Sequence, residues 1–281
     1  MTYVIHGATG AQGAPVVSAL AAAGKPVIAL TRNADADVPG ARVMTVGYSS
    51  EEGLTHAYAG ADGVFIHLPL GTEEDRRTYA RSIVAAVHAA RPGRVVFSTS
   101  GYAIEDGDES AVSTLIGGLA DSGVPYAVIA PELFFENLLL PHVVDGVRER
   151  GVLGYPLPAA FSVSWASHLD IADVAVTLFE RPDVSGVVGV GQYPAITGAE
   201  LAKAFGRRLG REVTYQAAAP EEYFGALAPM IGEGTAAGLA ANYRAMAKLP
   251  GRVIAPERSA QKLLGVTPRT AGEWLADMGL R

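Results

Sequence analysis

Three glycines, Gly7, Gly10 and Gly13, directly follow a short apolar segment, residues 3–6, and precede a helical pattern at residues 15–23. In dinucleotide-binding folds the first glycine of such a turn allows a sharp bend. The second lets the main chain approach a diphosphate, and the third lets the helix pack on the sheet with its N-terminus facing the phosphates. The spacing is GxxGxxG rather than GxGxxG. The alternative is a glycine-rich turn before an ordinary helix, but the position between strand and helix favours a dinucleotide site.

Short apolar segments alternate with helical patterns through the first half of the chain. We expect strands at residues 3–6, 27–30, 42–46, 63–67, 94–98 and 126–129, and helices at residues 15–23, 51–58, 73–90 and 113–122. This repetition predicts an α/β fold with a Rossmann-type doubly wound parallel sheet. Ligands of such sheets bind beyond the carboxyl ends of the strands, which places the expected site there.

The alternation stops after Pro131, and the second half of the chain is organised differently. A helix at residues 169–180 and a strand at 187–190 are expected to return to the sheet. We therefore expect residues 1–137, with 166–192 returning to them, to form the Rossmann domain. Residues 138–165 and 193–281 are expected to form a small, mainly helical C-terminal lid domain that contributes to substrate binding.

The residues after the second expected strand bear on the choice of dinucleotide. An NAD site commonly has an acid there for the adenosine ribose, but this chain has Thr31, Arg32 and Asn33, and its nearest acids are Asp35 and Asp37. A guanidinium suits a 2′-phosphate. We therefore expect NADP(H) to be preferred over NAD(H); the alternative is that Arg32 is a solvated loop cation.

Composition excludes several classes of function. A net charge of −7 without a cluster of basic residues argues against nucleic-acid binding. The absence of cysteine excludes disulfides and thiolate chemistry, and no His, Asp or Glu cluster has metal-ligand spacing. No apolar run reaches about eighteen residues, so we expect no membrane span. A cytoplasmic monomer or homodimer that acts on a small molecule is expected.

A catalytic pair common in reductases of this fold is missing. In that pair a lysine four residues after a tyrosine lowers the pKa of the phenol, which then exchanges a proton with the substrate. None of the 11 tyrosines has a lysine at that spacing, and no lysine occurs between Lys25 and Lys203. Any reductase chemistry must therefore proceed without this pair.

Several motifs together resemble the NmrA-like branch of the atypical short-chain dehydrogenases/reductases, which includes NADPH-dependent quinone reductases and redox-sensing regulators. The resemblance covers nearly the whole chain. The matching segments are residues 7–13 (GATGAQG), 31–33 (TRN), 60–65 (GADGVF), 94–100 (RVVFSTS), 131–138 (PELFFENL) and 168–175 (HLDIADVA). The resemblance implies that Arg32 holds the 2′-phosphate and that Thr9 and Gln12 line the pyrophosphate turn. It also implies that Leu68, Pro69 and Leu70 flank the cofactor, and that Phe134 and Asn137 lie near the nicotinamide and the substrate.

The chain departs from this family at two positions. Relatives commonly carry an acid after the third strand, near the adenine, where this chain has Tyr48 between Gly47 and Ser49. They often have an arginine before Pro131, where this chain has Ala130. The first departure leaves the contacts with the adenine undefined. The second means that no role of the family's arginine can be transferred to this chain.

The remaining candidate residues lie at expected strand ends. Ser98, Thr99 and Pro131 are expected to contact the cofactor, and Ser100, Phe135, Asn137 and His168 the substrate. Candidate proton donors are Tyr102, His67 and Glu132, although a tyrosine without a nearby lysine titrates near 10 and is a weak acid–base group at neutral pH. Each of these residues has a structural alternative. The hydroxyls and histidines at the strand ends could form hydrogen bonds with loop groups, and Glu132 could accept from backbone amides at a helix N-terminus. The phenylalanines could pack in a core together with Tyr155 and Trp165.

These observations favour an enzyme that transfers hydride from NADPH to a quinone or similar conjugated carbonyl. Hydride addition to a quinone gives a stabilised phenolate, so orientation beside the nicotinamide suffices without a strong acid. Two alternatives remain open. One is a non-catalytic regulatory protein that senses NADP(H), and the other is a biosynthetic tailoring enzyme on the same scaffold.

Overall fold

The computed structural model describes residues 1–104, 107 and 109–280, which divide into two compact units. The first unit comprises Met1–Pro131, His168–Val190 and Glu257–Val266, and the second comprises Glu132–Ser167, Gly191–Pro256 and Thr267–Arg281. The division differs from the expected one by two residues at each end of the returning segment, which is 168–190 rather than 166–192, and in two further segments. Residues 132–137 belong to the second unit, and residues 257–266 return to the first, where Ser259 forms a bridge with Gly189.

A seven-stranded sheet forms the centre of the first unit, and every neighbouring pair of strands is parallel. Its strand order is β11 (Gly186–Val190), β6 (Tyr126–Pro131), β5 (Val95–Ser98), β4 (Gly63–His67), β1 (Tyr3–Ile5), β2 (Val27–Thr31) and β3 (Arg42–Thr45). The order runs outward from β1 in both directions, which is the doubly wound arrangement. The fold class predicted from the sequence is confirmed.

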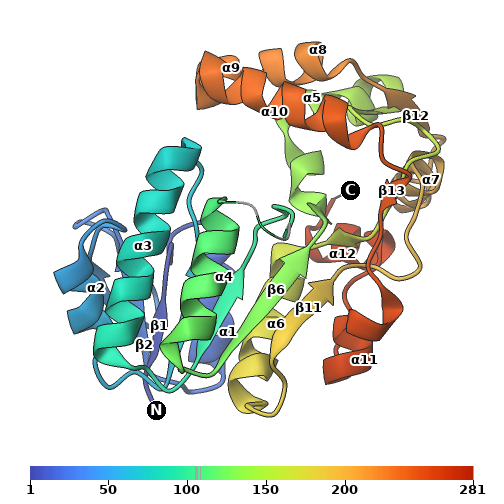
Figure 1. Cartoon of the computed structure of the whole chain (residues 1–281). Coiled ribbons are helices and arrows are strands. Elements are labelled where there is room, and N and C mark those ends of the chain that lie inside the picture. The colour runs from blue at the N-terminus through green and yellow to red at the C-terminus, as the bar shows by residue number, and fades with distance from the viewer. Residues whose placement is uncertain (105–106, 108, 281) are drawn as a thin grey trace. The chain divides into compact units, whose positions relative to one another are not determined.

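Helices cover both faces of this sheet. On one face α2 (Glu51–Tyr58), α3 (Glu73–Ala90) and α4 (Ala111–Ser122) lie side by side, as Figure 1 shows. On the other face α1 (Gly13–Ala22) packs against α6 (His168–Glu180). The first unit also contains the short helix α11 (Ala260–Leu264). The expected helices of this unit are confirmed, with ends that shift by up to two residues.

Local sequence signals explain where these helices begin. Ser50, Thr72 and Ser110 each accept a hydrogen bond from a backbone N–H three residues later, as N-cap residues do. Side-chain alternation then assigns the strand residues to the two faces. The Tyr3 ring lies 4.9 Å from that of Phe179 on α6, whereas Val4 belongs to the core cluster beneath α2, α3 and α4.

The second unit is built from short elements. Its strands pair in parallel twos, β7 (Leu133–Phe134) with β10 (Trp165–Ala166), β8 (Val152–Tyr155) with β12 (Thr214–Ala217), and β9 (Ser162–Val163) with β13 (Gly251–Arg252). Its helical segments are η1 (Phe135–Leu139), α5 (Pro141–Asp145), η2 (Gly146–Arg150), α7 (Gly198–Leu209), α8 (Pro220–Gly225), α9 (Ala228–Ile231), α10 (Glu233–Met246) and α12 (Ala271–Asp277). A further turn, η3 (Pro256–Arg258), spans the boundary between the units.

Aromatic stacking forms the centre of the second unit. The Phe135 ring stacks between those of Trp165 and Trp274, at centroid distances of 5.7 and 5.1 Å. Phe135 and Trp274 are fully buried. This unit therefore has a hydrophobic core of its own.

Candidate functional site

The turn after β1 brings the main chain together so closely that glycine is required at two positions. Gly7 has a φ of +57°, which lies in the left-handed region that other residues rarely adopt. A Cβ on Gly13 would lie 2.5 Å from the carbonyl oxygen of His6 and closer still to that of Gly7. Gly13 therefore lets α1 begin directly against the backbone that follows β1.

The N-terminus of α1 is suited to an anion. Its first turn, which the structure describes in full, contains no acidic residue, and Gln12 at the N-cap position makes no capping hydrogen bond. By contrast, α2 and α3 each have a hydroxyl cap and two or more acids in the first turn. The partial positive charge of the α1 N-terminus is therefore left for a bound group such as a diphosphate.

His67, a predicted proton donor, fills the space beneath this turn. A Cβ on Gly7 would lie 2.9 Å from Cε1 of His67 and closer still to its Nε2. Burial lowers the pKa of His67 to about 4; a hydrogen bond to the Leu68 backbone opposes this effect and the charge of His168 adds to it. His67 is neutral at pH 7, and its Nε2 has no hydrogen-bond partner among the described residues. This placement favours the structural interpretation.

His6, which ends the segment before Gly7, was not among the residues predicted from the sequence. Its side chain is buried, and Nε2 forms a hydrogen bond of 2.5 Å with the Tyr58 hydroxyl on α2. Burial lowers the pKa of His6 to about 3, and His67 contributes to this shift. The pair fixes the end of β1 to the helical layer, and no spacing in the sequence signals it.

The loop after β2 is ordered by its own side chains and leaves Arg32 exposed. Thr31 Oγ1 accepts a hydrogen bond from the Asn33 N–H, and Asn33 Oδ1 accepts one from the Asp35 N–H. The Arg32 charge favours the ionised form of Tyr48, whose pKa burial nevertheless raises well above the ordinary value. Arg32 and Tyr48 are therefore neighbours at this end of the sheet. The Tyr48 hydroxyl is buried, with no partner among the described residues.

The end of β4 divides into a buried and an exposed part. Leu68 packs in the core of the first unit, Pro69 is half-buried, and Leu70 is 69% exposed. The predicted contact of these residues with a cofactor stays a prediction.

A hydrogen-bonded network joins the glycine turn to the end of β5. Ser98 Oγ donates to Gln12 Oε1 at 2.7 Å, and Gln12 Nε2 donates to Ser100 Oγ at 2.8 Å. Ser98 and Thr99 are buried, whereas Ser100 is half-buried with a φ of +58°. Both ends of the Gln12 amide are thus engaged by serines. Three residues predicted separately therefore form one cluster.

Tyr102 has a cationic neighbour that the sequence analysis did not identify. The Arg76 guanidinium carbon, on α3, lies 3.7 Å from the centroid of the Tyr102 ring. Arg76 is buried, its Nη1 bonds to Glu73 at 2.7 Å, and its Nε and Nη2 have no partner among the described residues. Glu73 also accepts a hydrogen bond from the Ala111 N–H at the start of α4. The ring of Tyr102 therefore has an arginine side chain packed against it.

Other predicted residues of the first unit lie at its surface or at element ends. Thr9 and Gly10 are exposed in the turn, Pro131 ends β6 in a buried position, and His168 is half-buried at the start of α6. In the sheet order, β5, β4 and β1 are neighbours. The carboxyl edge of these three strands thus brings together Gly7, Gln12, His67, Ser98 and Ser100.

The second unit holds the predicted residues 132–137. Glu132, a predicted acid, forms an ion pair with Arg252 rather than bonding to backbone amides. Asn137 Nδ2 donates to the Tyr155 hydroxyl at 3.4 Å, and that hydroxyl forms a hydrogen bond of 2.7 Å with the Tyr243 hydroxyl. Phe134 is buried, with 9% of its surface exposed. Their contacts with a cofactor or substrate stay predictions.

Phe135, a predicted substrate contact, lies within the core. None of its surface is exposed, and Tyr155 and Trp165 belong to the same buried cluster. Of the two interpretations left open by the sequence, core packing is the one that its position supports.

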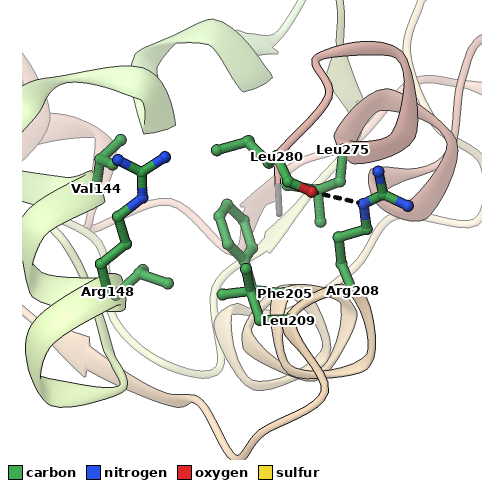
Figure 2. Close-up of a pocket in the computed structure, with 8 residues that line it drawn as sticks. Val144, Arg148, Phe205, Arg208, Leu209, Leu275 and Leu280 are labelled. Atoms are coloured by element: carbon green, nitrogen blue, oxygen red, sulfur yellow. Dashed lines mark hydrogen bonds between the residues drawn. The ribbon is translucent and has the colours of Figure 1, made fainter.

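A small pocket in the second unit lies among α5, η2, α7 and α12 (Figure 2). Its lining is apolar apart from Arg148 and Arg208, and Arg208 Nε donates to the Leu280 carbonyl oxygen at 2.7 Å. No acid, amide or hydroxyl side chain lines it. We therefore leave this pocket outside the candidate site.

Two classes of feature are absent from the part of the chain that the structure describes. No three or more His, Cys, Asp or Glu side chains there could together hold a metal ion. None of the helices in residues 1–104, 107 and 109–280 combines the length and apolarity needed to cross a membrane.

Comparisons with known proteins give a consistent picture. Residues 1–275 match the NmrA-like family. An NAD(P)H azoreductase of Xenophilus azovorans is 29% identical over 228 residues, 78% of either chain. A (4-alkanoyl-5-oxo-2,5-dihydrofuran-3-yl)methyl phosphate reductase of Streptomyces griseus is 31% identical over 221 residues, 76% of either chain.

A solved structure has the same fold. The NADPH-dependent quinone oxidoreductase QOR2 of Escherichia coli, complexed with NADPH, superposes with a TM-score of 0.76 and 23% identity. The match covers 99% of this chain and 100% of that one.

Proposed function

The chain belongs to the NmrA-like family, and from this premise we propose that it is an NAD(P)H-dependent oxidoreductase that reduces a quinone or a similar conjugated carbonyl. The observation that carries the proposal is the tight glycine turn of β1, which opens onto an α1 N-terminus without acid or cap, beside the hydroxyls at the end of β5. A diphosphate bound at that turn extends along a sheet edge lined with hydrogen-bonding groups.

The residues present fit a pyridine dinucleotide. Gly7 and Gly13 let the main chain fold back with its amides at the helix N-terminus, which is the environment a diphosphate requires. When bound, NADPH supplies a hydride. The protein contributes binding and orientation: the glycine turn holds the diphosphate, and the end of β5 presents hydroxyls to the reacting end.

Arg32 supports a preference for NADP(H). It is exposed directly after β2, and Thr31 and Asn33 on either side use their side chains to order the loop. No carboxylate occupies the positions directly after β2, where an acid would repel a 2′-phosphate. We therefore assign the 2′-phosphate to Arg32.

The substrate class follows from the relatives and from the missing lysine. The three relatives reduce, by their names, an azo compound, a furanone derivative and a quinone. Azo groups, unsaturated lactones and quinones are conjugated electrophiles that take up hydride. Reduction of a quinone gives a delocalised phenolate, so the absence of a Tyr–Lys pair costs little. Glu132, paired with Arg252, and His67, neutral at pH 7, are given no part in proton transfer.

The test is NADPH oxidation, followed by loss of the near-ultraviolet absorbance of the reduced nicotinamide, with a panel of quinones, azo dyes and unsaturated lactones. Sustained oxidation with quinones supports the proposal. Calorimetry on the same preparation measures NADPH binding without turnover. Tight binding with no oxidation by any acceptor would instead indicate a sensing protein. Turnover of a single lactone would indicate a tailoring enzyme, in keeping with the Streptomyces relative.

A further inference from the structure

The hydrogen bonds that join Gln12, Ser98 and Ser100 run in one direction. An amide oxygen only accepts and an amide NH₂ only donates, whereas a hydroxyl does both. Ser98 Oγ donates to Gln12 Oε1, and Gln12 Nε2 donates to Ser100 Oγ, at 2.7 and 2.8 Å. The direction therefore runs from Ser98 through Gln12 to Ser100.

Burial of Ser98 fixes this direction. Its side chain has no exposed surface, and its oxygen already accepts a hydrogen bond from the Ser100 N–H at 3.3 Å. If the Gln12 amide were turned around, Ser98 would also accept from the NH₂ group, and its own proton would lose its acceptor. A buried donor without a partner costs about 1–3 kcal/mol. The observed orientation avoids this cost.

The consequence falls on Ser100. One lone pair of its oxygen receives the Gln12 NH₂, so its only proton is available to another group. The structure shows no acceptor for that proton among the described residues. Ser100 is half-buried at the carboxyl edge of the sheet. Its backbone has a φ of +58°, a left-handed conformation that serine rarely adopts. The backbone thus holds a hydroxyl donor in place at the edge where ligands bind.

We propose that Gln12 is a positioning residue, which directs the Ser100 proton toward an acceptor atom of the substrate, and that it is not a phosphate contact. This inference rests on the proposed function and narrows it. The substrate presents a hydrogen-bond acceptor at its reacting centre, such as a carbonyl oxygen or an azo nitrogen, rather than a hydroxyl.

The hydrogen bond matters most as charge develops on the acceptor. The two electrons and the hydrogen of the hydride pass from NADPH to the quinone, which leaves NADP⁺ and a hydroquinone anion. The oxygen that gains the charge then takes a proton from water. Ser100 keeps its own proton and stabilises the anion by donating a hydrogen bond, which strengthens in the transition state.

The experiment compares Ser100→Gly, Gln12→Met and the double variant, with quinone as acceptor. Ser100→Gly removes the hydroxyl and relieves the left-handed backbone, which offsets the cost of leaving the Gln12 NH₂ without its acceptor. Circular dichroism of this variant checks that it is folded before its kcat is compared. We expect its kcat to fall about 10- to 100-fold, in the range that follows loss of one donor to a developing anion. Gln12→Met should lower kcat by a similar or smaller factor, and the double variant should be no slower than Ser100→Gly.

Two readouts separate positioning from a purely structural role. The Kd for NADPH, measured by calorimetry, should be unchanged in both single variants. The loss of kcat should be larger for an electron-rich quinone than for a halogenated one, because the oxygen of the former is the stronger acceptor. Ser122→Ala is the matched control: its hydroxyl is also buried and bonded, to the Leu119 carbonyl in α4, and its loss should leave kcat unchanged.

Three results would overturn the inference. An unchanged kcat of Ser100→Gly with quinone would show that the hydroxyl does not contribute to catalysis, and the proposed function would still stand. A Gln12→Met protein with weakened NADPH binding and unchanged kcat would make Gln12 a cofactor contact. Failure of the unmodified protein to oxidise NADPH with any acceptor would remove the proposed function itself, and this inference with it.

Discussion

The packing of His67 beneath Gly7 predicts an unusual rescue between two substitutions. Gly7→Ala alone should be strongly destabilising, because the new Cβ would lie within 2.9 Å of the His67 ring at a φ of +57°. The collision is with a side chain and not with the backbone. Removal of that side chain by His67→Ala should therefore restore part of the lost stability.

The magnitudes come from two separable costs. The left-handed conformation costs an alanine about 1–2 kcal/mol, and overpacking a filled site costs about 1–3 kcal/mol. Gly7→Ala should thus lower the free energy of unfolding by about 2–5 kcal/mol. His67→Ala removes only the overpacking. The coupling energy between the two substitutions should be about 1–3 kcal/mol in the compensating direction, as for other residues in contact.

The assay is urea unfolding followed by far-ultraviolet circular dichroism for the two single variants and the double variant. Gly13→Ala is the control, since a Cβ there would meet the carbonyl oxygens of Gly7 and His6, which His67→Ala leaves in place. We expect no rescue of Gly13→Ala. If the Gly7→Ala and His67→Ala effects add to within about 0.5 kcal/mol, the reasoning about the ring is refuted.

Three further predictions concern the cofactor, pH and the second core. Arg32→Ala should raise the Kd for NADPH about 10- to 100-fold in calorimetry and leave that for NADH unchanged, as expected for loss of a charge-assisted hydrogen bond; equal weakening of both would contradict the assignment. The pKa of His67 is lowered from 6.5 to about 4, so between these values the unfolded chain binds more protons and stability falls as the pH falls. This loss amounts to about 3 kcal/mol, and His67→Asn should reduce it when the free energy of unfolding is measured by denaturation at a series of pH values. An unchanged dependence on pH would show that another group causes the loss. Phe135→Ala should lower the free energy of unfolding by about 3–5 kcal/mol through loss of stacking, with KM for the quinone unchanged in the folded fraction; a raised KM would restore Phe135 as a substrate contact.

Sequence patterns predicted the first unit well because its signals are local. Period-two and period-3.6 hydrophobicity, N-cap residues and the glycine turn all lie within a few residues of the element that they define. The seven parallel strands follow from this repetition. Residues 257–266 return to the first unit, where Ser259 bridges to Gly189 and α11 packs against α6 and β11, and no local pattern encodes this return.

The candidate site was predicted in position but not in its contacts. Gln12, Ser98 and Ser100 were each identified from the sequence, but their hydrogen bonds join residues 86 and 88 positions apart. The guanidinium of Arg76 over Tyr102 depends equally on tertiary packing. The spacing of three residues between Glu73 and Arg76 on a helix predicts an ion pair, but it does not predict that the guanidinium packs on the ring of Tyr102.

The distribution of indole side chains has a practical consequence. The chain has two tryptophans, Trp165 and Trp274, and both belong to the second unit. Indole emission therefore reports the melting of that unit alone. The tyrosines of the first unit contribute at shorter wavelengths. A thermal scan that records indole emission and backbone ellipticity together can thus resolve whether the two units melt in one transition or in succession.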